Sequence, residues 1–353
     1  MDFAQLAAYR ARIESAVRRD YRTARPRPPS SVVPLVRMGE GLTLRGGKRF
    51  RAILLLAGYH IASGRRPDAV VGVAAGLEHF QSWMLIHDDI IDHSEVRRGG
   101  PTVHRLAADL HTLERGAGSS EEYGVGIGIT LGDLEEPYTV DSFLRARATA
   151  SARLAALAEY GRMTRLTAFG QLLDIRNGTL DPGDVTSADV LRVHELKSAI
   201  YTVVSPMLIG SLLAGTPRAR LADLERIGTD LGIAFQLRDD VLGAGFDAEE
   251  SGKSANDLAE GKRTLLVVHA WAHASEIQRD RLRRVLGNAS ATAEDVERAR
   301  EILRDTGSVD RSEREIARLS RRALSRLDQS PSIRSAAKPL LREIAQKLVE
   351  RKA

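Results

Sequence analysis

The chain has 353 residues, no cysteine, and 52 basic against 47 acidic residues, for a formal net charge of +5. The lack of cysteine excludes disulfide frameworks, thiolate metal sites and thiol nucleophiles. The near balance of charges does not match a nucleic-acid-binding tail, so we expect no nucleic acid partner, and the 43% apolar content is ordinary for a folded domain.

The first predicted element is an amphipathic helix over residues 3–22, which a proline-rich stretch over 22–31 interrupts. Helical periodicity returns in long segments and then in four shorter helices within 263–351; the long segments are 49–63, 68–93, 140–176, 186–214 and 219–243. Runs of period two are few. The pattern predicts one all-α domain over 1–353, made of an N-terminal helix and linker (1–30), a core (42–268) and C-terminal helices (269–353).

Three stretches rich in turn residues are predicted to be irregular, namely 114–126, 176–187 and 243–262. Pro137 is expected to end or kink its helix. No uninterrupted apolar run approaches the roughly 20 residues that span a bilayer, and the first residues show no signal peptide. We therefore expect a cytoplasmic protein without an integral membrane segment.

The densest polar cluster within an apolar helix is WMLIHDDIIDHSEVRRGGPTVH, residues 83–104. Asp88 and Asp92 lie four residues apart, so their carboxylates stack on one helical face and repel each other. A bound cation would remove that repulsion, and oxygen ligands without cysteine or histidine favour Mg²⁺. The alternative is a helix end whose acids are simply solvated.

A second acidic pair, Asp239-Asp240, ends another long apolar helix, with Gln236 one turn before Asp240. Gln171 and Asp174 have the same one-turn relation on a third helix. Polar side chains that face each other from several helices are typical of sites in the core of a helical bundle. Two acidic pairs at the ends of apolar helices therefore favour a metal site over solvated acids.

Basic residues accompany both acidic pairs. The segment GGKRFR places Lys48 and Arg51 three apart after a diglycine, near a helix start that favours anions. Arg97 and Arg98 follow the first acidic pair, and Lys253 and Lys262 follow the second. Carboxylates with Mg²⁺ and nearby cations form a site suited to diphosphate groups.

In this order, GGKRFR, DDIIDHSEVRRG, GQLLD, LKSAIYT, FQLRDD and GKSANDLAEGKRT resemble the motifs of the trans-type isoprenyl diphosphate synthases, the polyprenyl synthetase family, over about residues 42–268. The resemblance implies an isoprenoid-synthase-like helical bundle around a deep central cavity. It also implies a homodimer and three Mg²⁺ ions per site. The implied reaction is the condensation of isopentenyl diphosphate with an allylic diphosphate.

The resemblance also implies roles for individual residues. The Mg²⁺ ligands would be Asp88, Asp92 and Asp239, with Asp89 and Asp240 in support. The allylic diphosphate would contact Arg97, Lys197, Lys253 and Lys262, near Gln236. Isopentenyl diphosphate would be held by Gly47, Lys48, Arg51, Gln81 and Arg98. Gln171 and Asp174 would line the carbocation region or support the metals; Tyr201 and Thr202 receive no role. Catalysis would depend on Asp88, Asp92, Asp239, Arg97 and Lys197.

Product length in this family depends on the residues one turn before the first acidic motif, here Trp83 and Met84. Both are large, which predicts a short product of the farnesyl or geranylgeranyl class (C15–C20). We expect Trp83 to share a face with Asp88 and Trp83→Ala to lengthen the product. The competing interpretation is that Trp83 packs in the core, away from any cavity.

The sequence departs from the family pattern at Gly243, where many relatives have a third aspartate, and at Glu135, Glu136 and Pro137, where small and apolar residues are expected. Three other functions stay open: a terpene cyclase on the same fold, a non-catalytic subunit of a heteromeric synthase, and a nucleic-acid-binding helical protein. The intact GGKRFR and Arg97-Arg98 segments argue against the cyclase, and the retained aspartate pairs argue against the non-catalytic subunit. Basic residues that flank acids rather than forming one face argue against the nucleic-acid binder.

Overall fold

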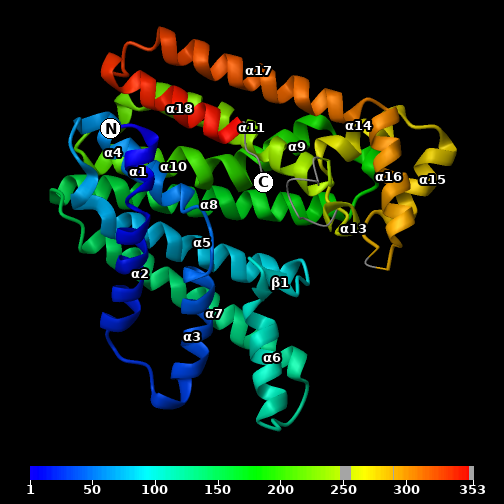
Figure 1. Cartoon of the computed structure of the whole chain (residues 1–353), viewed down its shortest axis with the longest axis horizontal. Helices are drawn as coiled ribbons and strands as arrows, with labels where there is room; N and C mark the ends of the chain where they lie inside the picture. The colour runs from blue at the N-terminus through cyan, green and yellow to red at the C-terminus, as the bar shows by residue number, and fades with distance from the viewer. Residues whose placement is uncertain (247–255, 289, 350–353) are drawn as a thin grey trace. The chain divides into compact units, whose positions relative to one another are not determined.

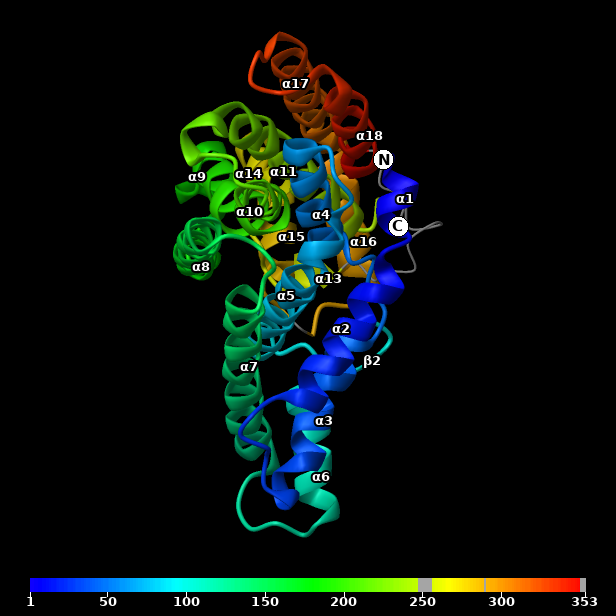
Figure 2. The same cartoon turned by 90° about the vertical axis from the view of Figure 1, so that its left-hand side faces the viewer.

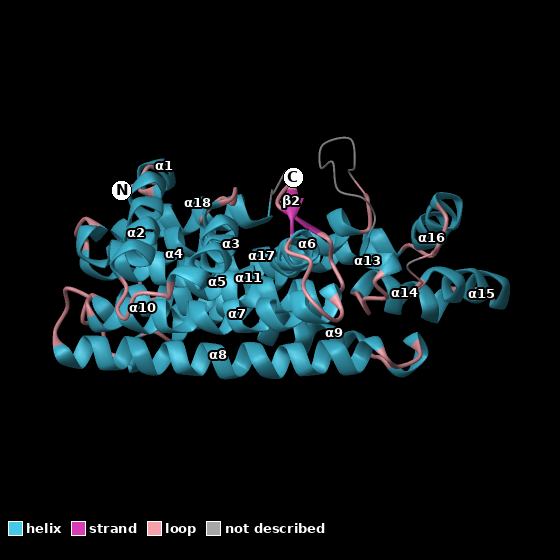
Figure 3. Cartoon of the chain, turned by 90° about the horizontal axis from the view of Figure 1, so that it is seen from below, coloured by secondary structure: helices cyan, strands magenta, loops and turns pink. Residues whose placement is uncertain are grey.

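The computed structural model describes residues 1–246, 256–288 and 290–349, and side-chain positions at 256 and 257 are not included (Figure 1). Lys253 of the predicted site lies outside these ranges. The described residues form helices and one two-stranded sheet (Figure 3), which confirms the all-α class predicted from sequence. They divide into two compact units, residues 1–157 with 209–216, and residues 158–208 with 217–353. The single domain over 1–353 stays a prediction.

The first unit is built on α5 (Val71–Ile91) and α7 (Ser120–Leu144), which pack against each other, and α6 (Val103–Leu113) also packs against α7. Figure 2 shows the loop that joins α6 to α7. An antiparallel hairpin pairs β1 (Val96–Arg97) with β2 (Gly100–Pro101). The unit also contains α1 (Phe3–Ala7), α2 (Arg10–Thr23), η1 (Ser30–Val32), α3 (Val33–Leu44), α4 (Phe50–Ser63), η2 (Pro67–Val70) and α6 (Val103–Leu113).

The second unit is built around α11 (Ala222–Gly243), which packs against α17 (Ser308–Gln329) and the π-helical segment η4 (His194–Val204). In Figure 1, α17 and α18 (Lys338–Val349) run side by side, and the two helices are in contact. The other elements are η3 (Pro182–Asp184), α9 (Ser187–Val193), η5 (Arg218–Arg220), α13 (Asn256–Ala259), α14 (Leu265–His273), α15 (Glu276–Val285), α16 (Ala293–Asp305) and η6 (Ser335–Ala337). Two helices, α8 (Ala150–Gly178) and α10 (Ser205–Leu213), have residues in both units.

Several predicted boundaries are wrong. The helix predicted over 140–176 is two helices, because α7 ends at Leu144 and α8 begins at Ala150. The N-terminal helix is likewise interrupted between α1 and α2. The irregular stretch predicted over 114–126 is already helical from Ser120, and α3 and α6 were missed. Among the described residues of 263–351, five helices, α14 to α18, stand where four were predicted.

Pro137 does not end its helix but lies inside α7. A proline removes one backbone hydrogen bond, to the carbonyl of Asp133 four residues earlier. Asp133 is on an exposed part of α7, with 63% of its side chain accessible, so water can replace that bond. The packing of α7 along α5 and α6 then keeps the helix continuous.

Glu135, which departs from the family pattern, is buried in the first unit. Its carboxylate accepts a hydrogen bond from the Tyr21 hydroxyl at 2.5 Å and lies 2.6 Å from His79 Nδ1. Burial raises the pKa of Tyr21 well above its usual value, and the Glu135 charge raises it further. This network joins α2, α5 and α7. The buried carboxylate of Glu135 is therefore hydrogen-bonded to its neighbours and does not stand unpaired.

Within the part of the chain that the structure describes, two helical spans are long and apolar enough to cross a membrane by length and composition, Pro67–Ile91 and Ser187–Leu213. Of their apolar windows, 67% and 83% respectively are buried inside the protein. A buried core helix passes the same test, so these spans are weak evidence for membrane insertion.

Candidate functional site

The first acidic motif stands at the C-terminal end of α5. Asp92 is the residue that caps the helix, and its amide donates to the Asp88 carbonyl at 2.8 Å. His93 follows in the left-handed region at φ 51° and ends the helix. Ile86, and Ile90 beside it, anchor this end in an apolar cluster with Leu42. The carboxylates of Asp88 and Asp92 are half-buried and one turn apart, as the sequence predicts.

Asp89 has different surroundings, because it is fully buried. Arg97, on β1, donates from Nε to Asp89 Oδ1 at 2.7 Å. Burial raises the pKa of Asp89 from its usual value, while the charge of Arg97 opposes that rise. The pair fixes the hairpin to the end of α5. This geometry fits the supporting role predicted for Asp89, and metal ligation by its carboxylate stays a prediction.

Three of the residues predicted to hold isopentenyl diphosphate come together in the first unit. With its amide oxygen turned toward the arginines, Gln81 accepts from Arg98 Nη2 at 3.1 Å and from Arg51 Nη1 at 3.0 Å. Arg98 Nη1 also donates to the Arg45 carbonyl at 3.1 Å. Burial lowers the pKa of Arg98 from its usual value, and neighbouring arginines lower it further against the opposing effect of Glu78. A cluster of partly buried cations of this kind is suited to a polyanion.

The diglycine of GGKRFR is required by the backbone and by this cluster. Gly46 and Gly47 have φ values of +55° and +83°, which a side chain would strain. A Cβ on Gly47 would also lie 3.3 Å from the guanidinium carbon of Arg98. Lys48 is exposed beside this turn. The turn therefore brings the backbone close to Arg98 and leaves Lys48 at the surface.

The hairpin turn places Arg98 in an unusual conformation. Arg98 and Gly99 are its two central residues and have φ values of +54° and +73°. Two positive φ values suit a two-residue hairpin, although a left-handed arginine stores some strain. Arg45 supports the hairpin by donating from Nη1 to the carbonyls of Arg97 at 3.2 Å and Pro101 at 2.9 Å. Arg45 was not among the predicted site residues, since nothing in its spacing distinguishes it from a surface arginine.

The second acidic motif stands near the C-terminal end of α11. Asp239 is half-buried, whereas Asp240 is buried. Asp240 Oδ1 accepts from Gln236 Nε2 at 2.9 Å, and its Oδ2 lies 3.0 Å from His194 Nε2. In each motif, therefore, one aspartate is buried and hydrogen-bonded, and the aspartate before it in the chain is more accessible. His194 was missed in the sequence because its partner is 46 positions away.

Lys197 lies in the π-helical segment, where its Nζ donates to Asp174 of α8 at 2.6 Å. The two segments approach closely at Gly170, where a Cβ would stand 2.3 Å from the Lys197 backbone nitrogen. Gln171 is half-buried on the same helix. π-helical turns often accompany functional sites, but the apolar pattern of the sequence predicts only an ordinary helix here.

Other predicted residues of the second unit have local surroundings. Lys262 Nζ is 2.5 Å from Glu260 Oε2. Tyr201 is half-buried and Thr202 is buried, both within the π-helical segment. Among the described residues, no group of three or more histidine, aspartate or glutamate side chains is gathered closely enough to hold a metal ion by itself.

The two predicted chain-length residues occupy different sides of α5. Five residues turn a helix by about 140° beyond one full turn, so the expected shared face of Trp83 and Asp88 is wrong. Trp83 instead makes ring contacts with Phe80 at 5.7 Å and His87 at 6.3 Å between centroids. Met84, four residues before Asp88, is within about 40° of the Asp88 direction. The role of both in product length stays a prediction.

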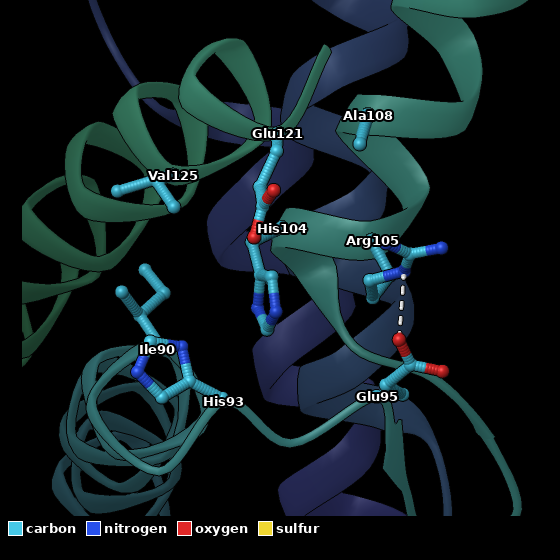
Figure 4. Close-up of a pocket in the computed structure, with 8 residues that line it drawn as sticks. All are labelled: Ile90, His93, Glu95, His104, Arg105, Ala108, Glu121 and Val125. Atoms are coloured by element: carbon cyan, nitrogen blue, oxygen red, sulfur yellow. Dashed lines mark ion pairs between the residues drawn. The ribbon is translucent and has the colours of Figure 1, made fainter. Parts of the chain in front are cut away.

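A cavity of about 120 Å³ opens beside the end of α5 (Figure 4). Glu95 and Arg105, which line it, form an ion pair with 3.8 Å between Oε1 and Nε. The other lining residues are Ile90, His93, His104, Ala108, Glu121 and Val125. The residues that line it are not among those predicted to bind substrate or metal.

Comparison with known proteins places these motifs in a family. The polyprenyl synthetase family model matches residues 34–303. A short chain isoprenyl diphosphate synthase from Methanothermobacter thermautotrophicus is 33% identical over 73% of this chain and 74% of its own length. A geranylfarnesyl diphosphate synthase from Aeropyrum pernix is 30% identical over 87% of this chain and 91% of its own.

A solved structure is similar over its whole length. Geranylgeranyl pyrophosphate synthase from Corynebacterium glutamicum, complexed with isoprenyl diphosphate and magnesium, has a TM-score of 0.91 and 30% identity, and covers 100% of both chains. The residues matched by the family model, 34–303, include both acidic motifs and the GGKRFR segment. The chain therefore belongs to the polyprenyl synthetase family.

Proposed function

We propose that the chain is a Mg²⁺-dependent trans-prenyltransferase that condenses isopentenyl diphosphate with an allylic diphosphate to give a short-chain prenyl diphosphate. The observation that carries the proposal is the cluster of Arg51, Gln81 and Arg98 in the unit that also carries Asp88 and Asp92. A chain with both an acidic pair for a metal-bound diphosphate and a cationic cluster can bind two diphosphates. The family relationship supports the same reaction.

The residues of the two acidic motifs fit a hard cation. Mg²⁺ would be held by the half-buried carboxylates of Asp88, Asp92 and Asp239. The buried neighbours Asp89 and Asp240 would support these ligands through their hydrogen bonds with Arg97 and Gln236. Oxygen donors at helix ends suit Mg²⁺, which keeps several waters and shares its coordination with substrate phosphates. This mode of binding does not require three protein side chains in one group. When bound, Mg²⁺ neutralises the charge that develops on the departing diphosphate. The number of ions, three by the resemblance, belongs to the same proposal.

The protein groups supply the rest of the chemistry. Arg97, Lys197 and Lys262, with Lys253, would bind the allylic diphosphate and stabilise it as the allylic C–O bond breaks and the electron pair leaves with oxygen. Lys48, Arg51 and Arg98 would hold isopentenyl diphosphate so that its double bond attacks the allylic carbocation. The new C–C bond forms, a proton is lost from the former isopentenyl unit, and the released diphosphate would accept it.

The other two enzyme-related interpretations are not favoured. A terpene cyclase needs no second diphosphate site, whereas this chain retains the Arg51, Gln81 and Arg98 cluster. A non-catalytic subunit has no need of both acidic motifs, and this chain keeps an aspartate pair in each of them. The relatives described above are named as diphosphate synthases.

The test is a product assay with Mg²⁺, isopentenyl diphosphate and dimethylallyl, geranyl or farnesyl diphosphate in turn. A longer prenyl diphosphate supports the synthase, and it should disappear when EDTA removes the metal. A hydrocarbon made from the allylic substrate alone would indicate a cyclase. No turnover with any substrate pair would contradict the proposal.

We also propose that the chain acts as a homodimer in the cytoplasm. On α8, the exposed side chains of Phe169, Leu172 and Ile175 form an apolar surface in the second unit, with Leu172 64% accessible. Burying such a surface against another copy would be favourable. We expect Leu172→Asp to be monomeric and the unaltered chain dimeric by sedimentation velocity. A monomeric unaltered chain would contradict the proposal.

Product length gives a prediction that separates two neighbouring residues. If large side chains on the Asp88 face limit the prenyl tail, Met84→Ala should lengthen the product by one or more isoprene units. Trp83→Ala should lengthen it less, because Trp83 contacts Phe80 and His87 on another side of α5. Chromatography of the dephosphorylated products measures the length. Unchanged products in both variants would mean that neither residue limits the chain.

A further inference from the structure

Arg49 is the one residue of GGKRFR whose side chain is buried, with 2% of its surface accessible. It has a left-handed backbone, φ 51° and ψ 36°, and immediately precedes α4. Its guanidinium points into the interior of the first unit, whereas the neighbouring Lys48 is exposed. A left-handed arginine with a buried side chain persists only if its surroundings hold it firmly.

The contacts of Arg49 account for this conformation. Nη1 donates to the Thr43 carbonyl at 2.7 Å, and Nη2 donates to the Leu44 carbonyl at 3.0 Å. These carbonyls belong to the last turn of α3, where a helix leaves acceptors without helical partners. The guanidinium therefore ties the end of α3 to the start of α4 across the short turn formed by Arg45, the diglycine and Lys48.

Two carboxylates complete the arrangement. Nη1 also donates to Glu78 Oε2 of α5 at 3.1 Å, and both side chains of this ion pair are 1% accessible. Nε donates to Glu14 Oε1 of α2 at 3.3 Å. Breaking one partner of a buried pair leaves an uncompensated charge, so the interaction holds its geometry strongly.

Glu78 is one helical turn from Gln81, the residue that joins Arg51 and Arg98. Arg51, in turn, is two residues after Arg49. The buried pair is thus linked to the cationic cluster along both α4 and α5. Glu78 is also an opposing negative charge for a cluster of like charges, which repel one another when no anion is bound.

We propose that Arg49, held by Glu78, is a positioning residue for the isopentenyl diphosphate site. It sets the diglycine turn and the first turn of α4 so that Lys48 and Arg51 meet the diphosphate, and it does not touch substrate itself. The inference rests on the proposed function. It predicts a selective effect, because the four hydrogen-bond partners of Arg49 described above belong to neither acidic motif.

The first variant is Arg49→Met in the full chain, assayed with Mg²⁺, isopentenyl diphosphate and geranyl diphosphate. We expect KM for isopentenyl diphosphate to rise about tenfold or more, since small misplacements of binding groups are costly. KM for geranyl diphosphate should change by less than about twofold, within the scatter expected for a site that is not disturbed. Arg49→Lys keeps the charge but cannot make all four hydrogen bonds, so it should also raise KM for isopentenyl diphosphate selectively. It replaces Arg49→Met in the assay if the methionine variant does not fold.

The double variant Arg49→Met/Glu78→Met separates positioning from stability. Replacing both partners of a buried pair by apolar groups restores much of the stability that a single replacement loses. We therefore expect the melting temperature of the double variant to recover while KM for isopentenyl diphosphate stays high. If that KM recovers together with the melting temperature, the role of Arg49 is only structural and the proposal is overturned.

A matched control is available in the second unit. Arg322 donates from Nε to the buried carboxylate of Asp230 at 3.0 Å, so Arg322→Met removes one ion pair of a buried carboxylate, which keeps its ion pair with Arg326. It should lower the melting temperature and leave both KM values unchanged. Equal rises of both KM values in Arg49→Met would contradict the proposal. Absence of turnover in the unaltered chain would show that the proposed function itself had failed, before any variant is compared.

Discussion

Asp88→Asn is expected to lower kcat/KM about 1000-fold, a loss of roughly 4 kcal/mol of transition-state stabilisation. The change keeps the shape of the side chain but removes the negative charge that would hold Mg²⁺ against the departing diphosphate. Asp88 is half-buried at the end of α5, and like-charge repulsion with Asp92 is relieved by the substitution. Thermal stability should therefore stay equal or rise slightly while activity falls, measured by scanning calorimetry and by product formation.

Two variants make this result interpretable. Asp109→Asn, at an exposed position on α6, removes a carboxylate of the same unit and should leave activity unchanged. Asp89→Asn removes the buried partner of Arg97 and tests whether Asp89 also ligates the metal. We expect it to raise KM for the allylic diphosphate without changing the Mg²⁺ concentration that gives half-maximal rate. A shift in that Mg²⁺ concentration would instead make Asp89 a ligand.

The acidic and basic motifs were predictable because their chemistry depends on local spacing. Asp88 and Asp92 lie one turn apart on any helix, and the apolar residues around them predict that helix. The same reasoning located Asp239 near the end of α11. It could not separate the two aspartates of each pair, because the buried state of Asp89 and Asp240 depends on Arg97 and His194, residues outside the helix that carries each aspartate.

The missed and misplaced helices have physical reasons of their own. Pro34 suggests a break, yet it stands in the first turn of α3, where the missing N–H has no helical partner to lose. Gly39 suggests a break as well, but its absent side chain makes room for Glu135, whose Oε1 would lie 3.0 Å from a Cβ there. Between α7 and α8 the residues 145–149 include no glycine or proline. The break is instead held by contacts such as Arg153 Nη1 with the Leu144 carbonyl at 2.6 Å.

Gly170→Ala is expected to lower the free energy of unfolding by about 1–3 kcal/mol, as overpacking in a filled interior does. The added methyl group would meet backbone atoms of the π-helical segment, 2.3 Å from the nitrogen and 2.7 Å from the Cα of Lys197. Backbone cannot rotate away as a side chain can, so α8 and this segment must separate. That movement should break the 2.6 Å bond between Lys197 and Asp174. Urea unfolding monitored by circular dichroism measures the stability.

Gly161→Ala on the same helix is the matched control. A Cβ there would meet only Arg165 Nη1 at 3.5 Å, so alanine should raise stability by about 0.5–1 kcal/mol through helix propensity. Because Lys197 is proposed to bind the allylic diphosphate, Gly170→Ala should also lower kcat/KM about 100-fold, whereas Gly161→Ala should not. If Gly170→Ala loses stability but keeps its kcat/KM, the close approach of α8 serves packing alone. Lys197 would then reach its substrate without the support of Asp174, and the functional meaning of the π-helical turn would have to lie elsewhere in that segment.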